Sequence, residues 1–450
     1  MQLVIINDYR WEVQVMKGKI LVISRNAWNN SNSTGNTATN FFSNWNDWEF
    51  ANLFCRNEIP NNDICKRYFR ISESDLLRGL FKSDKIGKAA SYEEFTEETE
   101  INSNANVSKE KRLYDHFRNN RWTLLLWARE ILWSVSNWKN SKLKKFVKDF
   151  DPDIIYMPIH DCFYMHNVLS FVSKISKAKI VLITADDMYS LKQFSLSPLY
   201  WINRLILRKK IRNSITKASI CYSMSDIQIK ELSQEFGNKF KILRKGVDLK
   251  FIKNTPKEPC GILRFVYTGN ITLGRWETIG TIGDAINSIN SDYVKATLEI
   301  YSTNLLTKDM AKKLNSSKEV RFLGAVKPQE VAEIQRGADV VIHAESFRLK
   351  SKLQTRLSFS TKLVDYFQNA KCILAVGWEK SNSIDYLLKN KAAIVVTDLK
   401  NLTKTLENIV VSKRIIEEFE KNAIDCAHKN HNINEIHKHL QADFDRLMCE

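Results

Sequence analysis

Short runs of apolar and β-branched residues recur along the chain, each separated from the next by a polar turn and a segment long enough for a helix. Continuous apolar strands that alternate with helices are typical of parallel sheets covered by helices on both faces. Because the alternation fills both halves of the chain, we expect an α/β fold with two such sheets. The runs occupy residues 20–24, 153–159, 179–184, 218–223 and 240–246, then 264–269, 296–302, 320–326, 338–344, 372–377 and 392–397.

The length of the chain also favours two domains, since 450 residues exceed what one hydrophobic core usually supports. Segment 253–260, KNTPKEPC, contains two prolines and mixed charges, as linkers often do. We therefore predict a first domain over 19–252 and a second over 261–425. Residues 426–450 form a polar, amphipathic helix, and residues 1–18 precede the first domain as an N-terminal extension.

Composition indicates the cellular compartment and the kinds of cysteine site to expect. No apolar stretch is long enough to span a bilayer, and the first residues lack the features of a secretion signal, so a cytoplasmic protein is expected. The eight cysteines are scattered, without a CxxC or Cys/His pattern. We interpret them as free, mostly buried thiols, and we expect neither a disulfide framework nor a metal site.

The formal charge of +17 is concentrated in part in residues 111–150, which hold ten Lys and Arg residues against three acids. This stretch also carries four tryptophans at near-helical spacing, which is typical of a helix lying on an anionic membrane surface. A core helix with a solvated end fits equally well, and residues 203–217 are ambiguous in the same way. No nucleic-acid-binding motif is present, so we expect no nucleic-acid partner.

The segment RFVYTGNITLGRWETI indicates a pocket for an anionic ligand. It is an apolar strand followed by Gly269 and Asn270, a loop that contains Arg275, and an amphipathic run. Such a loop directs backbone N–H groups and a cation at one point beyond the strand's carboxyl end. In open α/β sheets this is where anionic ligands bind.

A second segment, SFSTKLVDYFQNAKCILAVG, complements the first. Its turn, which includes Ser360, Thr361 and Lys362, begins an apolar-periodic helix that carries Asp365 on its first turns. Together the two segments predict a site for a nucleoside diphosphate. Asp365 is expected to accept hydrogen bonds from the ribose hydroxyls, although a helix-dipole role is the alternative.

With this architecture, the chain resembles the GT-B glycosyltransferases, in particular the broad retaining group of bacterial polysaccharide assembly (capsule, O-antigen or exopolysaccharide). Segment 222–248 is similar to that group's helix and NGVD-type strand end, and TGNITLGR to its phosphate loop. The helix from Thr361 to Ala370 is similar to the group's acidic-helix motif. The resemblance implies two Rossmann-like domains that face a cleft, with the donor sugar nucleotide on the second and the acceptor on the first. It also implies that the last helix crosses back to the first domain.

Two departures from the group bear on the chemistry. Its acidic motif has two carboxylates eight positions apart; Asp365 matches the second, but Leu357 stands at the first. The common lysine after the loop arginine is absent, since Arg275 is followed by Trp-Glu-Thr-Ile-Gly. Lys362 is the candidate for that charge, with an exposed helix terminus as the alternative.

Cleavage of a sugar nucleotide leaves negative charge on the diphosphate, so cations and N–H groups placed there lower the barrier. Arg275 and Lys362 are therefore the candidate catalytic cations, because arginine binds phosphate through two N–H groups and lysine supplies a point charge. The amides around Gly269, and from Ser360 to Thr361, are the candidate N–H donors. No metal or further cofactor is expected to be needed beside the nucleotide-diphosphate-sugar donor.

Acceptor-side candidates follow strands of the first half. His160 and Asp161 end the strand 153–159 and are candidates for contacting the transferred sugar. Asp186 and Asp187 end the next strand, where one is a candidate base for the acceptor hydroxyl and a capping role is the alternative. The remaining substrate-contact candidates are Glu345, after strand 338–344, and the polar residues Ser33, Thr34, Gly35 and Asn36, where glycine allows close backbone approach.

We predict a glycosyltransferase that moves a hexose-type sugar from a nucleotide donor to a glycan or lipid-linked acceptor, with retention implied by the resemblance alone. Three alternatives remain open. The missing first carboxylate fits a catalytically inactive GT-B domain that binds a sugar or a partner. The basic charge fits a scaffold bound peripherally at the inner face of the cell membrane. A nucleotide-sugar epimerase is the third.

Overall fold

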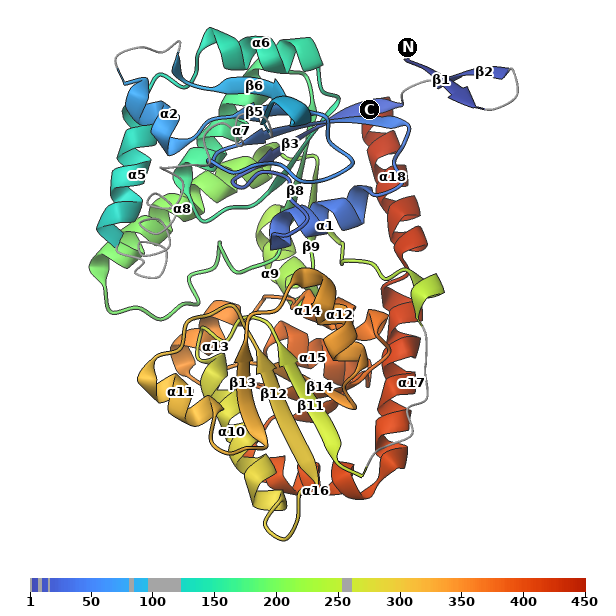
Figure 1. Cartoon of the computed structure of the whole chain (residues 1–450). Helices are drawn as coiled ribbons and strands as arrows, with labels where there is room; N and C mark the ends of the chain where they lie inside the picture. Colours follow the sequence, from blue (N-terminus) through green and yellow to red (C-terminus); the bar gives the residue numbers. More distant parts are fainter. Residues whose placement is uncertain (1, 7–9, 15–16, 81–84, 96–122, 253–260) are drawn as a thin grey trace.

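The computed structural model describes residues 2–6, 10–14, 17–80, 85–95, 123–252 and 261–450. Two domains, each built on its own sheet, lie one above the other in Figure 1. The expected α/β fold class with two parallel sheets is confirmed. The proposed linker 253–260, residues 1, 7–9 and 15–16 of the extension and residues 111–122 of the basic stretch lie outside the described residues.

The first domain contains an eight-stranded sheet in the order β10-β9-β8-β7-β3-β4-β5-β6. All neighbouring strands are parallel except β5 and β6. The strands are β3 (Gly18–Ser24), β4 (Trp48–Phe54), β5 (Arg67–Arg70), β6 (Lys88–Ser91), β7 (Ile154–Pro158), β8 (Lys179–Thr184), β9 (Ile220–Ser223) and β10 (Phe240–Ile242).

Alternate side chains of the central strand β3 enter two different cores, because successive residues of a strand point to opposite faces. Ile20 and Val22 pack with the face covered by α1 and α18, whereas Leu21 and Ile23 pack with the face covered by α5 to α8. The helices of this domain are α1 (Ser33–Phe42), α2 (Glu73–Arg78), α5 (Thr123–Val135), α6 (Ser141–Phe150), α7 (Phe163–Ile175), α8 (Pro198–Lys217) and α9 (Asp226–Phe236), with a 3-10 turn η2 (Leu249–Phe251).

The second domain contains a six-stranded, fully parallel sheet in the order β13-β12-β11-β14-β15-β16. Its strands are β11 (Leu263–Thr268), β12 (Ala296–Tyr301), β13 (Val320–Gly324), β14 (Val340–Ala344), β15 (Cys372–Val376) and β16 (Ile394–Val396). Its helices are α10 (Arg275–Ile289), α11 (Lys308–Leu314), α12 (Pro328–Arg336), α13 (Leu349–Thr355), α14 (Lys362–Gln368), α15 (Asn382–Lys389) and α16 (Leu402–Val411), with a 3-10 turn η3 (Leu399–Asn401).

The chain returns to the first domain at its end. Helix α17 (Lys413–Asn430) runs beside the second domain and α18 (Ile433–Cys449) beside the first, as Figure 1 shows. Phe444 packs edge-on against Trp45 and Trp48, and the hydroxyl of Tyr222 donates a 2.8 Å hydrogen bond to Asp443. The last helix therefore completes the core of the first domain, in addition to joining the two domains.

Five strands of the structure were not predicted from the sequence. They are β4, β5 and β6 of the first sheet, together with a separate hairpin of β1 (Gln2–Ile6) and β2 (Arg10–Gln14) that projects from the molecule. Among the helices of the described residues, none combines the length and apolar character needed to cross a bilayer.

The tryptophans of α5 and the following loop are packed inside the first domain. Trp133 stacks on Tyr164 with ring centroids 4.3 Å apart, and Trp138 lies edge-on to Trp133 and to Phe171. Of the two interpretations of this stretch, the core helix therefore holds for these two side chains. A membrane contact would have to use other residues of the same helices.

Candidate functional site

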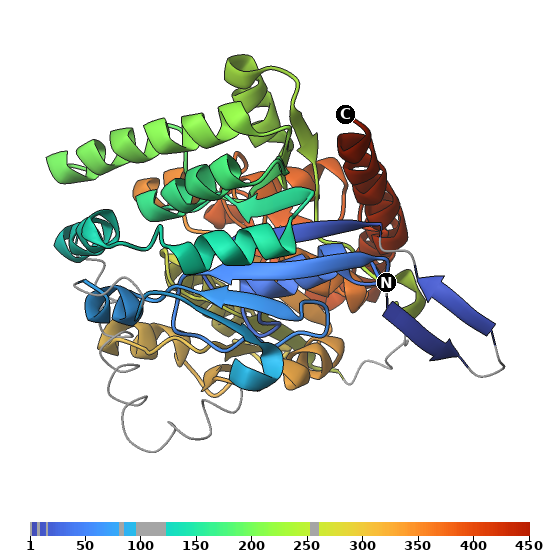
Figure 2. The same ribbon diagram turned by 90° about the horizontal axis from the view of Figure 1, so that it is seen from above.

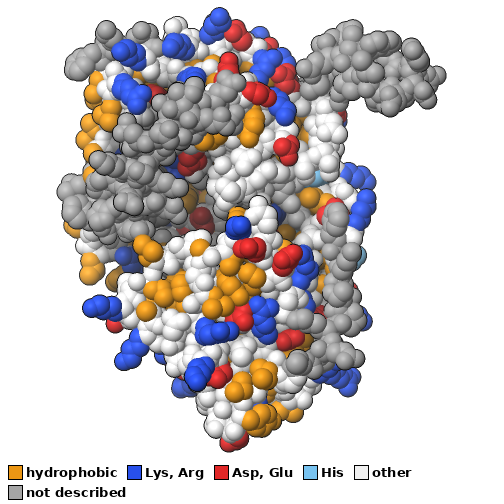
Figure 3. Space-filling view, in the orientation of Figure 1, with side chains coloured by type: hydrophobic (Ala, Val, Ile, Leu, Met, Phe, Trp, Pro, Cys, Tyr) orange, Lys and Arg blue, Asp and Glu red, His pale blue; other side chains and the backbone are white. Residues whose placement is uncertain are grey.

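The carboxyl ends of β11 and β14 form the point at which the order of the second sheet changes direction. From β11 the chain adds β12 and β13 on one side, and then returns to place β14, β15 and β16 on the other. The loops that leave two such strands diverge, so a crevice forms between them, and ligands of open α/β sheets bind there. Figure 3 shows a recess between the two domains, onto which this edge opens.

Arg275 and Glu345 meet in this crevice. Arg275 is the first residue of α10, and its Nη2 lies 3.1 Å from each carboxylate oxygen of Glu345, which follows β14. Both side chains are largely buried, with 16% and 6% of their surfaces exposed. Burial lowers the pKa of Arg275, but the charge and hydrogen bond of Glu345, together with Tyr267 and Asp186, outweigh it and hold the pKa above its usual value. The arginine is thus a fixed cation, held in place by a carboxylate.

Lys362 brings a second cation to the same place from the start of α14. Its Nζ donates a 3.1 Å hydrogen bond to the hydroxyl of Tyr267, and its side chain passes over the backbone of Gly269. Burial lowers the pKa of Lys362, and the nearby guanidinium of Arg275 adds to the effect. Two cations held this close repel one another, so the crevice favours an anion that lies between them.

His343, on β14, lies beneath the two cations. Its Nε2 is 3.7 Å from the carboxylate of Glu345 and has no hydrogen-bond partner among the described residues. Burial lowers the pKa of His343 far below its ordinary value, and the charges of Lys362 and Arg275 lower it further. The imidazole is therefore neutral and adds no charge to the crevice.

The loop amides do not play the role that the sequence suggested. The N–H of Gly269 donates to the carbonyl of Tyr301, and the N–H of Ser360 donates to the hydroxyl of Ser383. The side chain of Asn270 is also committed, because its oxygen accepts hydrogen bonds from Thr272. These three groups stabilise the loops themselves, so they are not available to an anion.

Asp365 lies at the boundary between the domains. Lys245, which follows β10 of the first domain, donates a 3.3 Å hydrogen bond to its carboxylate. The side chain of Asp365 is about half exposed and that of Lys245 is mostly buried. The carboxylate therefore keeps a solvent-facing side on which a ligand hydroxyl can bind, and it also links the two domains.

A second group of polar residues occupies the corresponding point of the first sheet, where β3 and β7 diverge. Arg25, after β3, pairs with Asp161, after β7, at 2.8 Å. His160 precedes that aspartate. Burial and the Arg25 charge lower its pKa to about 3, and its Nε2 has no hydrogen-bond partner among the described residues. A neutral histidine in this position can exchange a hydrogen bond with a sugar hydroxyl.

The polar segment after β3 is the first turn of α1, rather than the expected ligand-binding loop. Asn32 caps the helix by accepting a hydrogen bond from the N–H of Gly35. A side chain at Gly35 would lie 2.2 Å from the carbonyl oxygen of Asn29, so the close approach is to the chain's own backbone. Ser33, Thr34 and Asn36 belong to the same turn, on the side of the first domain that faces the second (Figure 1).

The aspartates after β8 have separate environments. Asp186 is exposed, accepts a hydrogen bond from Ser358 across the domain boundary, and raises the pKa of Arg275 through its charge. Asp187 is buried and pairs with Arg204 and with Arg356. With both of its oxygens engaged by these partners and by Ser190, Asp187 is not a candidate base. Contrary to the prediction, Asp187 therefore has no carboxylate oxygen left to contact a substrate.

The sequence did not reveal Arg356 as a link between the domains. Its position among several basic residues after β14 does not distinguish it from exposed ones such as Arg348 and Lys350. Its guanidinium binds both oxygens of Glu231, at 2.6 and 2.9 Å, and one oxygen of Asp187. The described residues contain no group of three or more His, Cys, Asp and Glu side chains arranged to hold a metal ion.

Comparisons with known proteins bear on the fold. The sequence matches no family model and no curated protein. The structure is similar to HepE of Anabaena in complex with UDP, with 12% identity over 95% of this chain and 100% of that chain and a TM-score of 0.62. It is similar to sucrose-phosphate synthase of Thermosynechococcus elongatus, with 12% identity over 96% and 100% of the two chains and a TM-score of 0.63.

A third similar structure is the trehalose 6-phosphate synthase of Burkholderia multivorans, at 10% identity over 96% of this chain and 99% of that one, with a TM-score of 0.62. All three matches extend over both domains. The chain therefore has the GT-B fold, the two-domain architecture of nucleotide-sugar-dependent glycosyltransferases.

Proposed function

We propose that the protein transfers a hexose-type sugar from a nucleoside diphosphate donor to a glycan or lipid-linked acceptor, in the synthesis of a cell-surface polysaccharide. The observation that carries the proposal is the position of Arg275 and Lys362. Both cations lie at the point where the loops that leave β11 and β14 diverge, within the recess between the domains. The similar structures of HepE with UDP and with UDP and glucose support a nucleotide-sugar donor.

On the donor side, the diphosphate would bind between the two cations. Arg275 contacts both oxygens of Glu345 through Nη2 alone, and its guanidinium carries further N–H groups that would bind a phosphate. As the bond between sugar and diphosphate breaks, negative charge grows on the leaving phosphate. Arg275 and Lys362 stabilise that charge without reorganisation, because both are already fixed in the crevice. Asp365 would accept hydrogen bonds from the ribose.

On the acceptor side, His160 and Asp186 would face the transferred sugar. His160 is neutral and has an unpartnered buried nitrogen, so it is suited to orient a sugar hydroxyl. Asp186 is exposed at the domain boundary and sits close enough to influence Arg275, so it is the better candidate of the two aspartates for a base. Retention of the anomeric configuration follows only from the resemblance to the retaining GT-B group.

One observation favours a second candidate function, a GT-B domain that binds a nucleotide sugar without turnover. Leu357 stands where the group has its first carboxylate, and it is buried in the core with 2% of its surface exposed. No acidic side chain can therefore act from that position. Glu345 is the nearest carboxylate to Arg275, and it would have to supply any missing contact.

The two candidates are separated by measuring nucleotide release from UDP-, GDP- and ADP-sugars, with and without a mixture of glycan acceptors. Transfer predicts nucleotide release that increases with acceptor and falls in the Arg275→Ala variant. Binding without turnover predicts that a nucleotide sugar protects the protein against heat while no nucleotide is released. An epimerase would instead interconvert donor sugars in the absence of acceptor. If no donor binds at all, the proposed function is wrong.

A further inference from the structure

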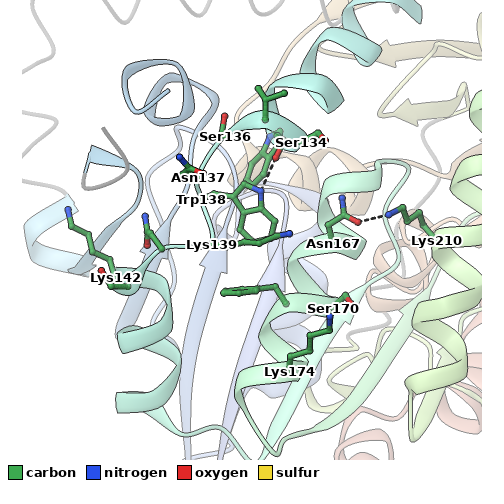
Figure 4. Close-up of a pocket in the computed structure, with 15 residues that line it drawn as sticks. Ser134, Ser136, Asn137, Trp138, Lys139, Lys142, Asn167, Ser170, Lys174 and Lys210 are labelled. Atoms are coloured by element: carbon green, nitrogen blue, oxygen red, sulfur yellow. Dashed lines mark hydrogen bonds between the residues drawn. The ribbon is translucent and has the colours of Figure 1, made fainter. Parts of the chain in front are cut away.

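A cavity of about 740 Å³ lies on the outer part of the first domain, away from the recess between the domains. It is formed by the end of α5, the loop to α6, the start of α6, and the facing sides of α7 and α8. Its volume is in the range of small-molecule sites. Figure 4 shows residues from these elements converging on one space, although they are far apart in the sequence.

The charged side chains that line the cavity are all basic. Four lysines line it, and none of its fifteen lining residues carries a carboxylate. The lysines are Lys139, Lys142, Lys174 and Lys210, of which Lys210 donates a 2.7 Å hydrogen bond to Asn167 (Figure 4). Asparagine and serine side chains occupy much of the remaining lining. Such a cavity attracts phosphate groups, and its amides and hydroxyls can bind a ligand that also carries hydroxyls.

The wall of the cavity is aromatic and rigid. Trp138 is buried, donates a 2.8 Å hydrogen bond from its indole N–H to the carbonyl of Trp133, and packs edge-on against Phe171. Because these rings are part of the core of the domain, the cavity exists before any ligand binds. The lysines are therefore attached to a rigid part of the domain.

Exposed apolar side chains lie on two of the four helices that border the cavity, α5 and α8. On α5 they are Leu125, Leu126, Ile131 and Val135, and the last also lines the cavity. On α8 they are Leu199, Ile202 and Leu205, which share one face because they are spaced three residues apart. Helix α8 has no acidic residue, and both views show α5 and the first half of α8 at the same side of the molecule (Figures 1 and 2).

We propose that this face of the first domain docks on an anionic phospholipid surface, with the lysine-lined cavity receiving a lipid headgroup. Charge complementarity favours this occupant: the four lysines face the phosphates, and the exposed apolar side chains of α5 and α8 enter the adjoining interface. A soluble phosphorylated ligand would use the lysines but would leave the apolar side chains in water.

The proposal does not depend on sugar transfer, and its test measures membrane binding alone. The purified full-length protein is sedimented with phosphatidylcholine vesicles that do or do not contain phosphatidylglycerol. We expect binding only to the vesicles with phosphatidylglycerol, and we expect it to weaken as the ionic strength rises, because screening shortens the reach of the lysine charges.

Two variants locate the binding face. The double variant Lys139→Glu with Lys174→Glu should weaken vesicle binding at least about tenfold, since each surface lysine contributes to attraction by anionic lipid. The control is Lys421→Glu with Lys429→Glu, which makes the same charge change at exposed positions of α17. It should reduce binding less than about threefold. Leu199→Ser with Ile202→Ser should also weaken binding, because both side chains are exposed apolar residues of α8.

Three results would overturn the proposal. The first is equal binding to vesicles with and without phosphatidylglycerol. The second is an equal loss in the control and in the cavity variant. The third uses glycerol 3-phosphate as a soluble probe: if it stabilises the wild type but not the Lys139→Glu, Lys174→Glu variant, and vesicles do not bind, the cavity holds a soluble phosphate instead of a lipid.

Discussion

Arg275 and Lys362 are the residues on which the proposed chemistry depends most. Replacement of Arg275 by alanine removes a cation that would stabilise the leaving diphosphate, so transfer should fall by about two orders of magnitude. The matched control is Arg348→Ala, because Arg348 is an exposed arginine of the same region that pairs with Glu277. Steady-state rates of nucleotide release measure both variants, and near-normal turnover in Arg275→Ala would remove this residue from the mechanism.

Gly269 offers an independent probe of Lys362. Its φ of 123° is unfavourable for other residues, and a Cβ there would lie 2.7 Å from the lysine Nζ. Gly269→Ala should therefore lower the free energy of unfolding by about 1–3 kcal/mol and also weaken nucleotide binding, since the ammonium must move.

Gly237 is the control, because it also has a positive φ but an added Cβ would meet no atom within 4 Å. Gly237→Ala should lose a similar amount of stability and no nucleotide affinity. Urea denaturation and nucleotide titration of the two variants test this. Equal affinity in both variants would show that the position of Lys362 does not matter for binding.

Among single residues, the charged groups of the site could be predicted from the sequence more reliably than the residues that pair with them. Arg275 and Lys362 follow recognisable strand and turn patterns, so their meeting could be expected. The use of the Gly269 and Ser360 amides could not, because it depends on Tyr301 and Ser383, whose positions are set by tertiary packing. Asp187 was misjudged for the same reason, since its partners Arg204 and Arg356 are distant in sequence.

Among the helices and strands, the junction between α17 and α18 has a pH-dependent stability that can be measured. His431 lies there, fully buried, between the hydroxyl of Tyr386 and the carbonyl of Lys245. Burial lowers its pKa to about 4. An unfolded chain binds a proton at about pH 6.5, so this histidine contributes full stability above that pH and loses it as the pH falls.

Between pH 7 and pH 5 the loss from His431 should be about 2 kcal/mol. In His431→Gln, which does not titrate, the decrease in unfolding free energy over that range should be smaller by this amount. The control His428→Gln changes an exposed histidine of the same helix and should keep the wild-type pH dependence. Urea denaturation at the two pH values measures the effect, and equal slopes in all three proteins would contradict it.

The elements themselves were predicted unevenly from the sequence. The fully buried strands, such as β8 and β15, are continuous apolar runs and were expected with nearly the observed bounds. In contrast, β4 contains a glutamate and an asparagine, and β5 and β6 are short and contain charged residues, so each of these strands depends on pairing with its neighbour in the sheet. The start of α1 was interpreted as a loop because its residues are polar. These residues cap and begin a helix that is buried on one side only.

For the whole molecule, the ion pairs of Arg356 hold the two domains together on one side of the recess. Arg356→Met removes one of the two cationic partners of the buried Asp187 and of Glu231, so the free energy of unfolding should fall by about 1–3 kcal/mol. The solution radius of gyration should also increase as the domains separate. Lys350→Met, at an exposed position of α13, the helix that ends next to Arg356, is the control. Unchanged stability and radius in Arg356→Met would show that other contacts set the domain arrangement.

The central claim is that a nucleoside diphosphate binds between Arg275 and Lys362. Calorimetric titration of the wild type with UDP, GDP and ADP tests it most directly, with Arg275→Ala, Lys362→Ala and the control Arg348→Ala measured alongside. We predict that one nucleotide binds with one site per chain, and that each of the first two variants loses at least about tenfold in affinity while the control does not. Binding that is absent from the wild type, or unchanged in both site variants, would contradict the account.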